Sequence, residues 1–194
     1  MGMSHFFAYI SKMKFIYRWG LKRNTHNENI QEHSYQVAVI AHALAVIRNK
    51  VFGGSINPDR VAVLALFHDV SEVLTGDLPT PIKYFNPKIN TAYKEIEKVA
   101  DRRLFSMLPE QLKPEYKPIF FQNGKDSEHR LLVKAADVIC AYLKCLEEVK
   151  SGNQEFVMAE KSLKEKVEKL KLPEVCFFLE KYVPSFSLTL DELN

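Results

Sequence analysis

The chain has 194 residues, of which 46% are hydrophobic and 26% charged, and its formal net charge is +3. This length fits one domain, residues 1–194, with a sizeable buried core. The small net charge argues against a nucleic-acid polymer as partner. No apolar run approaches the roughly 18 residues of a membrane span, the N-terminus lacks a signal-peptide pattern, and three cysteines form no Cys-x-x-Cys pair. We therefore expect a cytoplasmic protein that has no membrane partner.

Helical periodicity dominates the chain, whereas period-two alternation is scarce and no internal repeat is present. Interruptions fall at 52–57, where Asn57 and Pro58 form a helix-start signal, and at 76–81. None of the breaks is long enough to be a linker between domains. The sequence therefore predicts a single compact all-α domain.

Near the N-terminus, Arg18 and Trp19 form the first candidate binding pair. A guanidinium can bind phosphate oxygens through two parallel hydrogen bonds, and an adjacent indole can form the wall of a pocket or stack on a flat group. Trp19 is the only tryptophan of the chain, and a role as a core or lid anchor is equally consistent with the sequence.

The next predicted element is a helix that begins after Asn29, a residue typical of an N-cap, with Glu32 three positions later. The helical pattern continues through 37–47, so His33 lies close to the helix start. His42 follows nine residues later, about 180° around the helix, and cannot bind the same ion as His33 unless the helix breaks.

His68 and Asp69 lie in an apolar run, 61–70, that predicts a continuous helix. Two metal-capable side chains in such a helix are costly to bury without a partner, and a divalent cation would offset that cost. A lone His-Asp pair is more often structural. Here, however, Glu72 follows one turn later and projects over the same patch.

The segment 76–81 leaves this helix about one turn after Glu72. Its two prolines restrict the backbone, so Asp77 and Thr80 are expected on a stiff rim close to His68. A simple helix stop is the alternative interpretation, because Gly-Asp before proline commonly ends a helix.

Asp137 lies within a further helical run, 131–143, among apolar neighbours, and a salt bridge to Lys134 is the alternative role for its carboxylate. With His33, His68 and Asp69 it gives two imidazoles and two carboxylates from three helices. Such a donor set suits a first-row divalent ion with water at the open positions, and the lack of cysteine ligands argues against a closed structural zinc site. An open site indicates hydrolysis.

The order His…His-Asp…Asp resembles the HD-domain metal-dependent phosphohydrolases, and longer segments resemble the bacterial HD-domain 5′-deoxynucleotidases. Those segments are 4–8, Arg18-Trp19, 32–34, His68-Asp69, 71–81, 134–137, 141–148 and 184–186. The run 71–81 is the most specific of them, and the resemblance covers essentially the whole chain.

This resemblance implies an HD-domain helical bundle that removes the 5′-phosphate from deoxyribonucleoside 5′-monophosphates, with broad base tolerance, as a homodimer. It implies a divalent cation, with Co, Mn, Cu and Zn as candidates, held by His33, His68, Asp69 and Asp137. The substrate residues that it implies are Arg18, Trp19, His33, Asp69, Asp77, Leu78, Pro79, Thr80 and Asp137. Among them, Arg18 would orient the phosphate, Trp19 would pack near the sugar, and Asp77 would accept a hydrogen bond from the 3′-hydroxyl.

Glu72 and Arg18 are the predicted catalytic residues. Glu72 would transfer a proton, as base toward water or as acid toward the leaving 5′-oxygen, and Arg18 would neutralise charge on the phosphoryl oxygens. The alternatives are another HD-domain nucleotide hydrolase, such as a triphosphohydrolase or phosphodiesterase, and a non-catalytic helical module that binds a metal or anion. A triphosphohydrolase or phosphodiesterase would need more phosphate-binding cationic side chains near the site than the motifs supply. A module that only binds a metal or anion has no need of a proton-transfer group such as Glu72.

Overall fold

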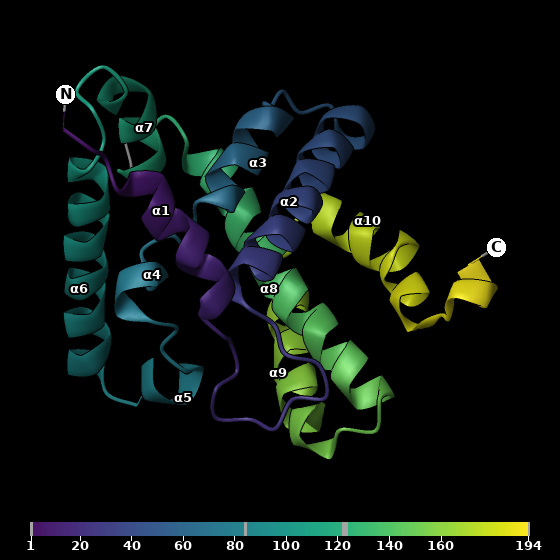
Figure 1. Ribbon diagram of the computed structural model, residues 1–194. Coiled ribbons are helices and arrows are strands. Elements are labelled where there is room, and N and C mark those ends of the chain that lie inside the picture. The colour runs from purple at the N-terminus through teal and green to yellow at the C-terminus, as the bar shows by residue number, and fades with distance from the viewer. Residues whose placement is uncertain (1, 84, 122–123, 194) are drawn as a thin grey trace.

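The computed structural model describes residues 2–83, 85–121 and 124–193. Within these ranges the chain is built from helices and contains no β-strand, which confirms the all-α prediction (Figure 1). None of the described helices combines the length and the apolar character that a membrane crossing requires. The α-helices are α1 (Phe6–Ile10), α2 (Ile30–Phe52), α3 (Pro58–Leu66), α4 (Glu72–Thr75), α5 (Thr80–Lys83), α6 (Pro87–Ser106), α7 (Lys113–Phe120), α8 (Ser127–Lys150), α9 (Val157–Glu168) and α10 (Pro173–Lys181). The 3₁₀ segments are η1 (Ser11–Phe15), η2 (Gln154–Phe156), η3 (Val183–Ser187) and η4 (Leu190–Leu193).

The two longest helices, α2 and α8, cross at the centre of the molecule, and α3, α9 and α10 pack around them (Figure 1). Their contact forms the main apolar core, in which Val37 and Leu44 of α2 and Ile139 and Leu143 of α8 are fully buried. The predicted metal ligands His33 of α2 and Asp137 of α8 are therefore carried by extensively packed helices.

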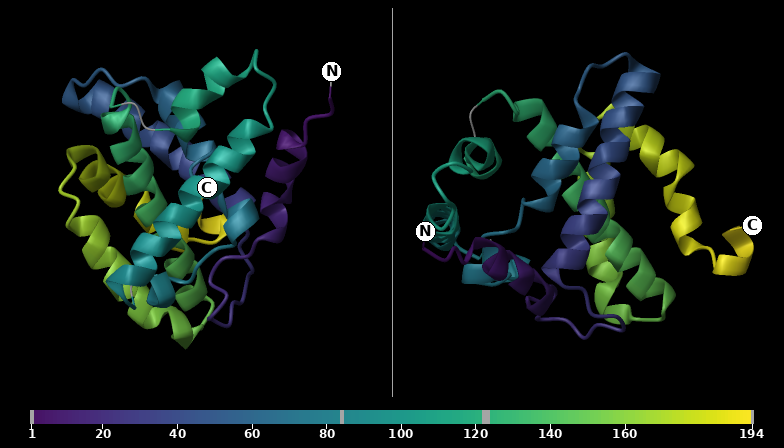
Figure 2. Two further views of the ribbon diagram at one scale, coloured as in Figure 1. Left: turned by 90° about the vertical axis from the view of Figure 1, so that its left-hand side faces the viewer. Right: turned by 45° about the horizontal axis from the view of Figure 1, so that its top comes forward.

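A second apolar cluster lies on the other side of α2, beneath α1, α6 and α7. It joins Phe6, Met13, Ile30, Val70 and Leu104, and Figure 2 shows α1 and α6 on one side of the molecule with α10 on the opposite side. Because Ile30 begins α2 and Val70 follows the His-Asp pair, this cluster fixes the backbone at two of the three places where metal ligands were predicted.

The start of α2 has the predicted capping box. The Asn29 side chain accepts hydrogen bonds from the backbone N–H groups of Gln31 and Glu32, each at 3.0 Å, and the Glu32 carboxylate accepts one from the Asn29 N–H at 3.4 Å. These bonds satisfy donors that a helix start leaves without partners. They also fix the first turn, in which His33 lies.

The prediction of a continuous helix over 61–70 was wrong, because α3 ends at Leu66. His68 and Asp69 lie in successive tight turns between α3 and α4, in which the His68 N–H donates to the Ala65 carbonyl at 3.2 Å. The His68 ring offers the helix end a local partner, since its Nδ1 lies 2.7 Å from the same carbonyl. An apolar run does not reveal this break, because a buried turn needs the same apolar side chains as a buried helix.

Candidate functional site

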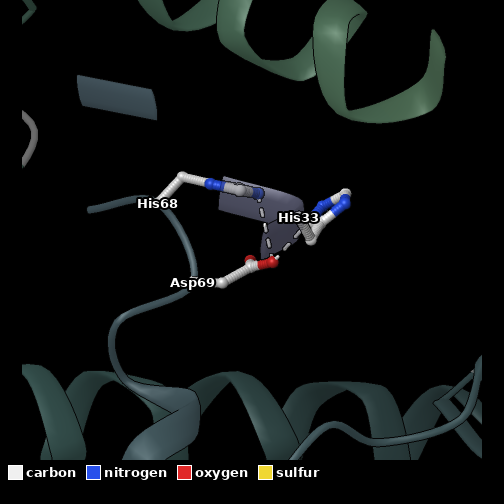
Figure 3. Close-up of side chains that lie close together, drawn as sticks. All are labelled: His33, His68 and Asp69. Carbon is white, nitrogen blue, oxygen red and sulfur yellow. Dashed lines mark ion pairs between the residues drawn. The ribbon is translucent and has the colours of Figure 1, made fainter. Parts of the chain in front are cut away.

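The candidate site lies where the first turn of α2 meets the turn between α3 and α4. His33, His68 and Asp69 each offer a ligand atom, and these atoms all lie within 4.8 Å of one another (Figure 3). The Oδ2 atom of Asp69 lies 3.1 Å from Nε2 of His68 and 3.7 Å from Nε2 of His33. This group could hold a metal ion.

Asp137 reaches the same place from α8. Its Oδ1 atom lies 3.1 Å from Nε2 of His33, and no ion pair with Lys134 is found in the part of the chain that the structure describes. Asp137 stands outside the compact group of three and contacts it through His33. A role for Asp137 as fourth ligand therefore stays a prediction.

The four predicted metal ligands differ in solvent exposure, which increases from the α2 side of the site to the α8 side. The His33 side chain is fully buried, those of His68 and Asp69 are 14% and 20% exposed, and that of Asp137 is 38% exposed. The buried side is thus formed by the helix start of α2, and the more open side by α8 and its carboxylate.

The hydrogen bonding of His68 fits a metal ligand. A carbonyl oxygen only accepts, so Nδ1 of His68 is the protonated nitrogen that donates to Ala65. Its Nε2 is buried and makes no hydrogen bond among the described residues. It lies 3.1 Å from Oδ2 of Asp69, so this nitrogen and that carboxylate could bind the same ion in a site with two imidazoles and two carboxylates.

The charges of the group also fit a cation. Burial opposes ionisation of His68, but the Asp69 carboxylate raises the pKa of the imidazole to about 9. Burial would raise the pKa of Asp69, yet His68 and then His33 hold it well below its usual value. Metal binding needs a neutral imidazole, so a cation here would take the place of the proton that Asp69 now stabilises.

Glu72 lies at the start of α4, beside this group. Its side chain is buried, and its Oε2 atom has no hydrogen-bond partner among the described residues. Burial, and then the carboxylates of Asp69 and Asp77, raise the pKa of Glu72 to about 9. A carboxyl group with a strongly raised pKa beside a ligand cluster is suited to proton transfer.

The guanidinium of Arg18 contacts the carboxylates of Asp69 and Glu28. Its Nη1 atom lies 3.4 Å from Oδ2 of Asp69, and its Nε donates to Glu28 at 3.0 Å. Burial acts to lower the pKa of Arg18, but Asp69 and Glu28 raise it above its usual value, so the side chain stays cationic. Because the positively charged guanidinium of Arg18 faces His33, His68 and Asp69, it can pair with an anion that enters the site.

Trp19 lies next to Arg18, and its indole packs on Phe156 of η2 with the ring centroids 5.3 Å apart. Its Nε1 donates to the Glu28 carboxylate at 3.0 Å. The sequence interpretation missed Glu28 and Phe156. Neither position lies in a recognisable motif, and their contacts with Trp19 depend on the fold alone.

The segment 76–79 connects α4 to α5 next to Glu72. The Tyr93 hydroxyl of α6 donates to the Gly76 carbonyl at 2.9 Å and fixes the start of this segment. Burial raises the pKa of Asp77 and Arg18 opposes that rise, so the two side chains interact electrostatically. Leu78 and Pro79 are half-buried, and the exposed Thr80 begins α5.

Solved structures show the same fold. An HD-domain phosphohydrolase from Listeria innocua superposes with a TM-score of 0.82 at 24% identity, over 94% of this chain and 88% of that one. An HD phosphohydrolase of cyanophage S-2L, solved with dA and one catalytic Zn²⁺ ion, gives a TM-score of 0.68 at 21% identity, over 92% and 96% of the two chains.

Sequence relatives match over the full length. A protein from Vibrio cholerae named 5′-deoxynucleotidase is 55% identical over the whole of both chains. The 5′-deoxynucleotidase YfbR of Escherichia coli is 52% identical over all of this chain and 98% of that protein. The family model described as 5′-deoxynucleotidase YfbR-like matches residues 5–186. The chain therefore belongs to the YfbR-like 5′-deoxynucleotidase family.

Proposed function

We propose that this protein hydrolyses the 5′-phosphate of deoxyribonucleoside 5′-monophosphates in a metal-dependent reaction, with broad tolerance of the base. The observation that carries the proposal is the His33, His68 and Asp69 group, with Arg18 and Glu72 beside it, in a chain 52–55% identical over its full length to proteins named 5′-deoxynucleotidase. The product classes are a deoxynucleoside and inorganic phosphate.

We propose His33, His68, Asp69 and Asp137 as the residues that hold the divalent cation. The donor set and the closeness of His68 Nε2 to Oδ2 of Asp69, at 3.1 Å, support this assignment. When bound, the ion would lower the pKa of a water molecule and polarise a phosphate oxygen. Co, Mn, Cu and Zn are all compatible with two imidazoles and two carboxylates, and the Zn²⁺ of the cyanophage enzyme is one of these four.

The proposed reaction is an in-line displacement at phosphorus. Arg18 binds the phosphoryl oxygens and neutralises the charge that develops on them. Glu72 transfers a proton, either from the attacking water or to the leaving 5′-oxygen. The positions of Arg18 and Glu72 beside Asp69 support these two roles. The Nη1 atom of Arg18 lies 3.4 Å from Oδ2 of Asp69, and the backbone N–H of Glu72 donates to the Asp69 carbonyl at 3.0 Å.

We propose that Trp19 and the segment from Asp77 to Thr80, with Leu78 and Pro79, surround the sugar. Asp77 accepts a hydrogen bond from the 3′-hydroxyl, and the Trp19 ring packs against the C2′ side. An added 2′-hydroxyl would then be crowded or left without a partner, at a cost of about 1–3 kcal/mol. Discrimination is therefore expected for the sugar and not for the base.

We also propose a homodimer in the cytoplasm, with residues 1–194 acting as one domain. Tyr35 and Val39, one turn apart on α2, are 68% and 52% exposed and line a surface hollow with Phe186. Large exposed apolar side chains that gather at one place favour a protein partner. Light scattering would measure the mass in solution and so test the homodimer.

The cytoplasmic location is supported by the three cysteines, which are free thiols and therefore compatible with a reducing compartment.

One experiment tests the activity directly. Phosphate release is measured for nucleoside mono-, di- and triphosphates in ribo and deoxy forms, after chelation and addition of single divalent metals. The expected result is hydrolysis of deoxyribonucleoside monophosphates, about ten- to a hundredfold faster than of their ribo counterparts. Equal hydrolysis of both sugars contradicts the deoxy preference, and release from triphosphates alone favours a triphosphohydrolase.

A further inference from the structure

One buried carboxylate, Glu28, contacts three of the residues to which the site assigns a function. It lies in the segment before α2 and is 8% exposed. Its Oε2 atom accepts hydrogen bonds from Nε of Arg18 and Nε1 of Trp19, both at 3.0 Å. Its Oε1 atom lies 3.7 Å from Nδ1 of His33, the ring nitrogen that faces away from Asp69 and Asp137.

The backbone ties the same residues together. The Arg18 N–H donates to the Glu28 carbonyl, and the Ile30 N–H donates to the Ile16 carbonyl, each at 2.9 Å. These bonds form an isolated antiparallel bridge between residues 17 and 29, just before α2 begins. The segments on either side of the bridge are therefore held in register, and the Glu28 carboxylate is delivered to Arg18 and to the start of α2.

Trp19 has a backbone conformation that needs this support. Its φ is +61°, in the left-handed region that bulky side chains rarely adopt. Such a conformation persists where the surroundings fix it. The contacts that fix the indole are the Glu28 carboxylate on its N–H and the ring of Phe156 on its face.

We propose that Glu28 is a positioning residue that sets the orientation of Arg18, Trp19 and His33 together. Toward the phosphate, it holds one edge of the guanidinium and leaves Nη1 directed at the ligand group. Toward the sugar, it holds the indole against Phe156. Toward the metal, its Oε1 atom faces Nδ1 of His33 at 3.7 Å, without a hydrogen bond, on the side of the ring from which a carboxylate commonly orients a ligating histidine. The proposal deepens the proposed function and rests on it only for the sugar preference.

The first test uses Trp19, the only tryptophan, as a probe in the absence of nucleotide. Intrinsic fluorescence is compared in wild type, Glu28→Gln and Glu28→Ala. We expect a shift of the emission to longer wavelength and stronger acrylamide quenching in both variants, larger in Glu28→Ala, since the amide of Glu28→Gln keeps one acceptor oxygen. Divalent metal affinity, measured by calorimetry, should fall about ten- to a hundredfold, the usual cost of losing an outer partner of a ligating histidine.

The matched control is Glu174→Gln. Glu174 is another buried carboxylate paired with an arginine, since Arg48 donates to it from Nε at 3.0 Å, but Arg48 lies at the far end of α2 from His33. This variant should lose stability and keep the Trp19 emission and the metal affinity of wild type. It separates the loss of any buried carboxylate from the loss of this one.

The second test measures kcat and KM for deoxy and ribo monophosphates that share one base. Glu28→Gln should lose about tenfold or more of the sugar preference, and Glu28→Asp should restore part of it. Unchanged fluorescence, metal affinity and sugar preference in a folded Glu28→Gln protein would overturn the proposal, even if its unfolding temperature falls. A wild type that hydrolyses no deoxyribonucleoside monophosphate would instead overturn the proposed function, and the nucleotide-free measurements would still decide the role of Glu28.

Discussion

The two nitrogens of His68 have separate functions. Nδ1 donates to the Ala65 carbonyl at the end of α3, and Nε2 faces Asp69 at 3.1 Å. The turn that ends the helix therefore sets the orientation of the ring and keeps Nδ1 protonated, so Nε2 is the nitrogen that would lose its proton to an ion. The break in the helix is part of how this proposed ligand is presented.

Replacing His33, His68, Asp69 or Asp137 singly by alanine should lower both the metal content and the rate of hydrolysis, because each removes one proposed donor. Metal content is measured by elemental analysis after equilibration with the ion. Asp59→Ala, which removes a carboxylate whose side chain is 94% exposed on α3, is the control and should keep both. Full occupancy with near-normal turnover in Asp137→Ala would contradict the four-ligand assignment.

Glu72→Gln should reduce turnover by about two to four powers of ten while metal and substrate binding persist, since the amide keeps the shape and loses the proton-transfer group. Turnover, KM and metal content are measured on the same preparation. Glu95→Gln, an exposed carboxylate on α6, should behave as wild type. A parallel loss of metal would make Glu72 a ligand.

Among the elements, the segment from Tyr17 to Asn29 holds Arg18, Trp19 and Glu28 without regular secondary structure. Its far end is tied to the end of α8 by Glu148, which is 1% exposed. The Glu148 carboxylate accepts hydrogen bonds from the Thr25 N–H at 2.9 Å and hydroxyl at 2.7 Å, and pairs with Lys144. One buried carboxylate thus fixes the part of the segment around Thr25 to α8.

Glu148→Gln should lower the free energy of unfolding by about 3–5 kcal/mol at neutral pH, because it leaves the buried Lys144 without its counter-charge. Burial opposes ionisation, but Lys144 and Thr25 hold the pKa of Glu148 well below its unfolded value. Because the pKa of Glu148 is lower in the folded than in the unfolded protein, its carboxylate stabilises the folded protein at pH values above the unfolded pKa of about 4.3. This stabilisation is lost as the pH falls below that value toward the folded pKa.

Urea unfolding from pH 7 down to pH 3 measures this effect, and the difference between wild type and Glu148→Gln should shrink as the pH falls. Glu165→Gln removes an exposed pair with Lys169 and should change stability by less than about 1 kcal/mol at every pH. A difference between wild type and Glu148→Gln that stays constant with pH would contradict the assigned ionisation.

The elements that the sequence predicted correctly are those with a local cause. Asn29 and Asn57 cap α2 and α3 as expected, since a cap needs only its own first turn, and the run 131–143 lies inside α8. The end of α3 at Leu66 was missed because the residues that follow are buried in a turn that looks like helix in sequence. Val70, just after this turn, packs with Phe6 of α1 and Leu104 of α6, contacts that are distant in sequence and leave no local signal.

The candidate site divides in the same way. Metal-capable side chains in apolar surroundings are visible in a sequence, so His33, His68 and Asp69 could be predicted together, and the structure brings them within 4.8 Å. Glu28 could not be predicted, because its contacts depend on the bridge between residues 17 and 29. The register of a bridge between two irregular segments has no periodic signal.

At the scale of the whole molecule, α2 contributes to both apolar clusters. Val37 and Leu44 belong to the main core with α8, and Ile30 belongs to the cluster beneath α1 and α6. The group of His33, His68 and Asp69 lies next to both clusters, since His33 is in α2 between Ile30 and Val37, and Asp69 precedes Val70. An ion that binds there would connect the two halves of the fold.

Removal of the ion should therefore lower the unfolding temperature of the whole domain. A ligand at 100 times its dissociation constant stabilises the native state by about 2.7 kcal/mol, which corresponds to about 5–11 °C for a domain of this size. Calorimetry before and after chelation measures the difference, and returning the metal should reverse it. Asp69→Ala should not respond to chelation, and a wild type that is equally indifferent would contradict a site that couples to folding.

The increase in side-chain exposure from His33 to Asp137 also favours one order in which the proposed ligands would release an ion. His33 is fully buried, capped from behind by Glu28 and held in the first turn of α2, whereas the Asp137 side chain is 38% exposed. If all four residues hold an ion, water has access to the Asp137 carboxylate before the buried imidazole, and we expect a departing ion to leave Asp137 first and His33 last. The carboxylates of Asp69 and Asp137 lie 3.7 Å and 3.1 Å from Nε2 of His33, so the donors that an ion would meet are already assembled around the buried ring.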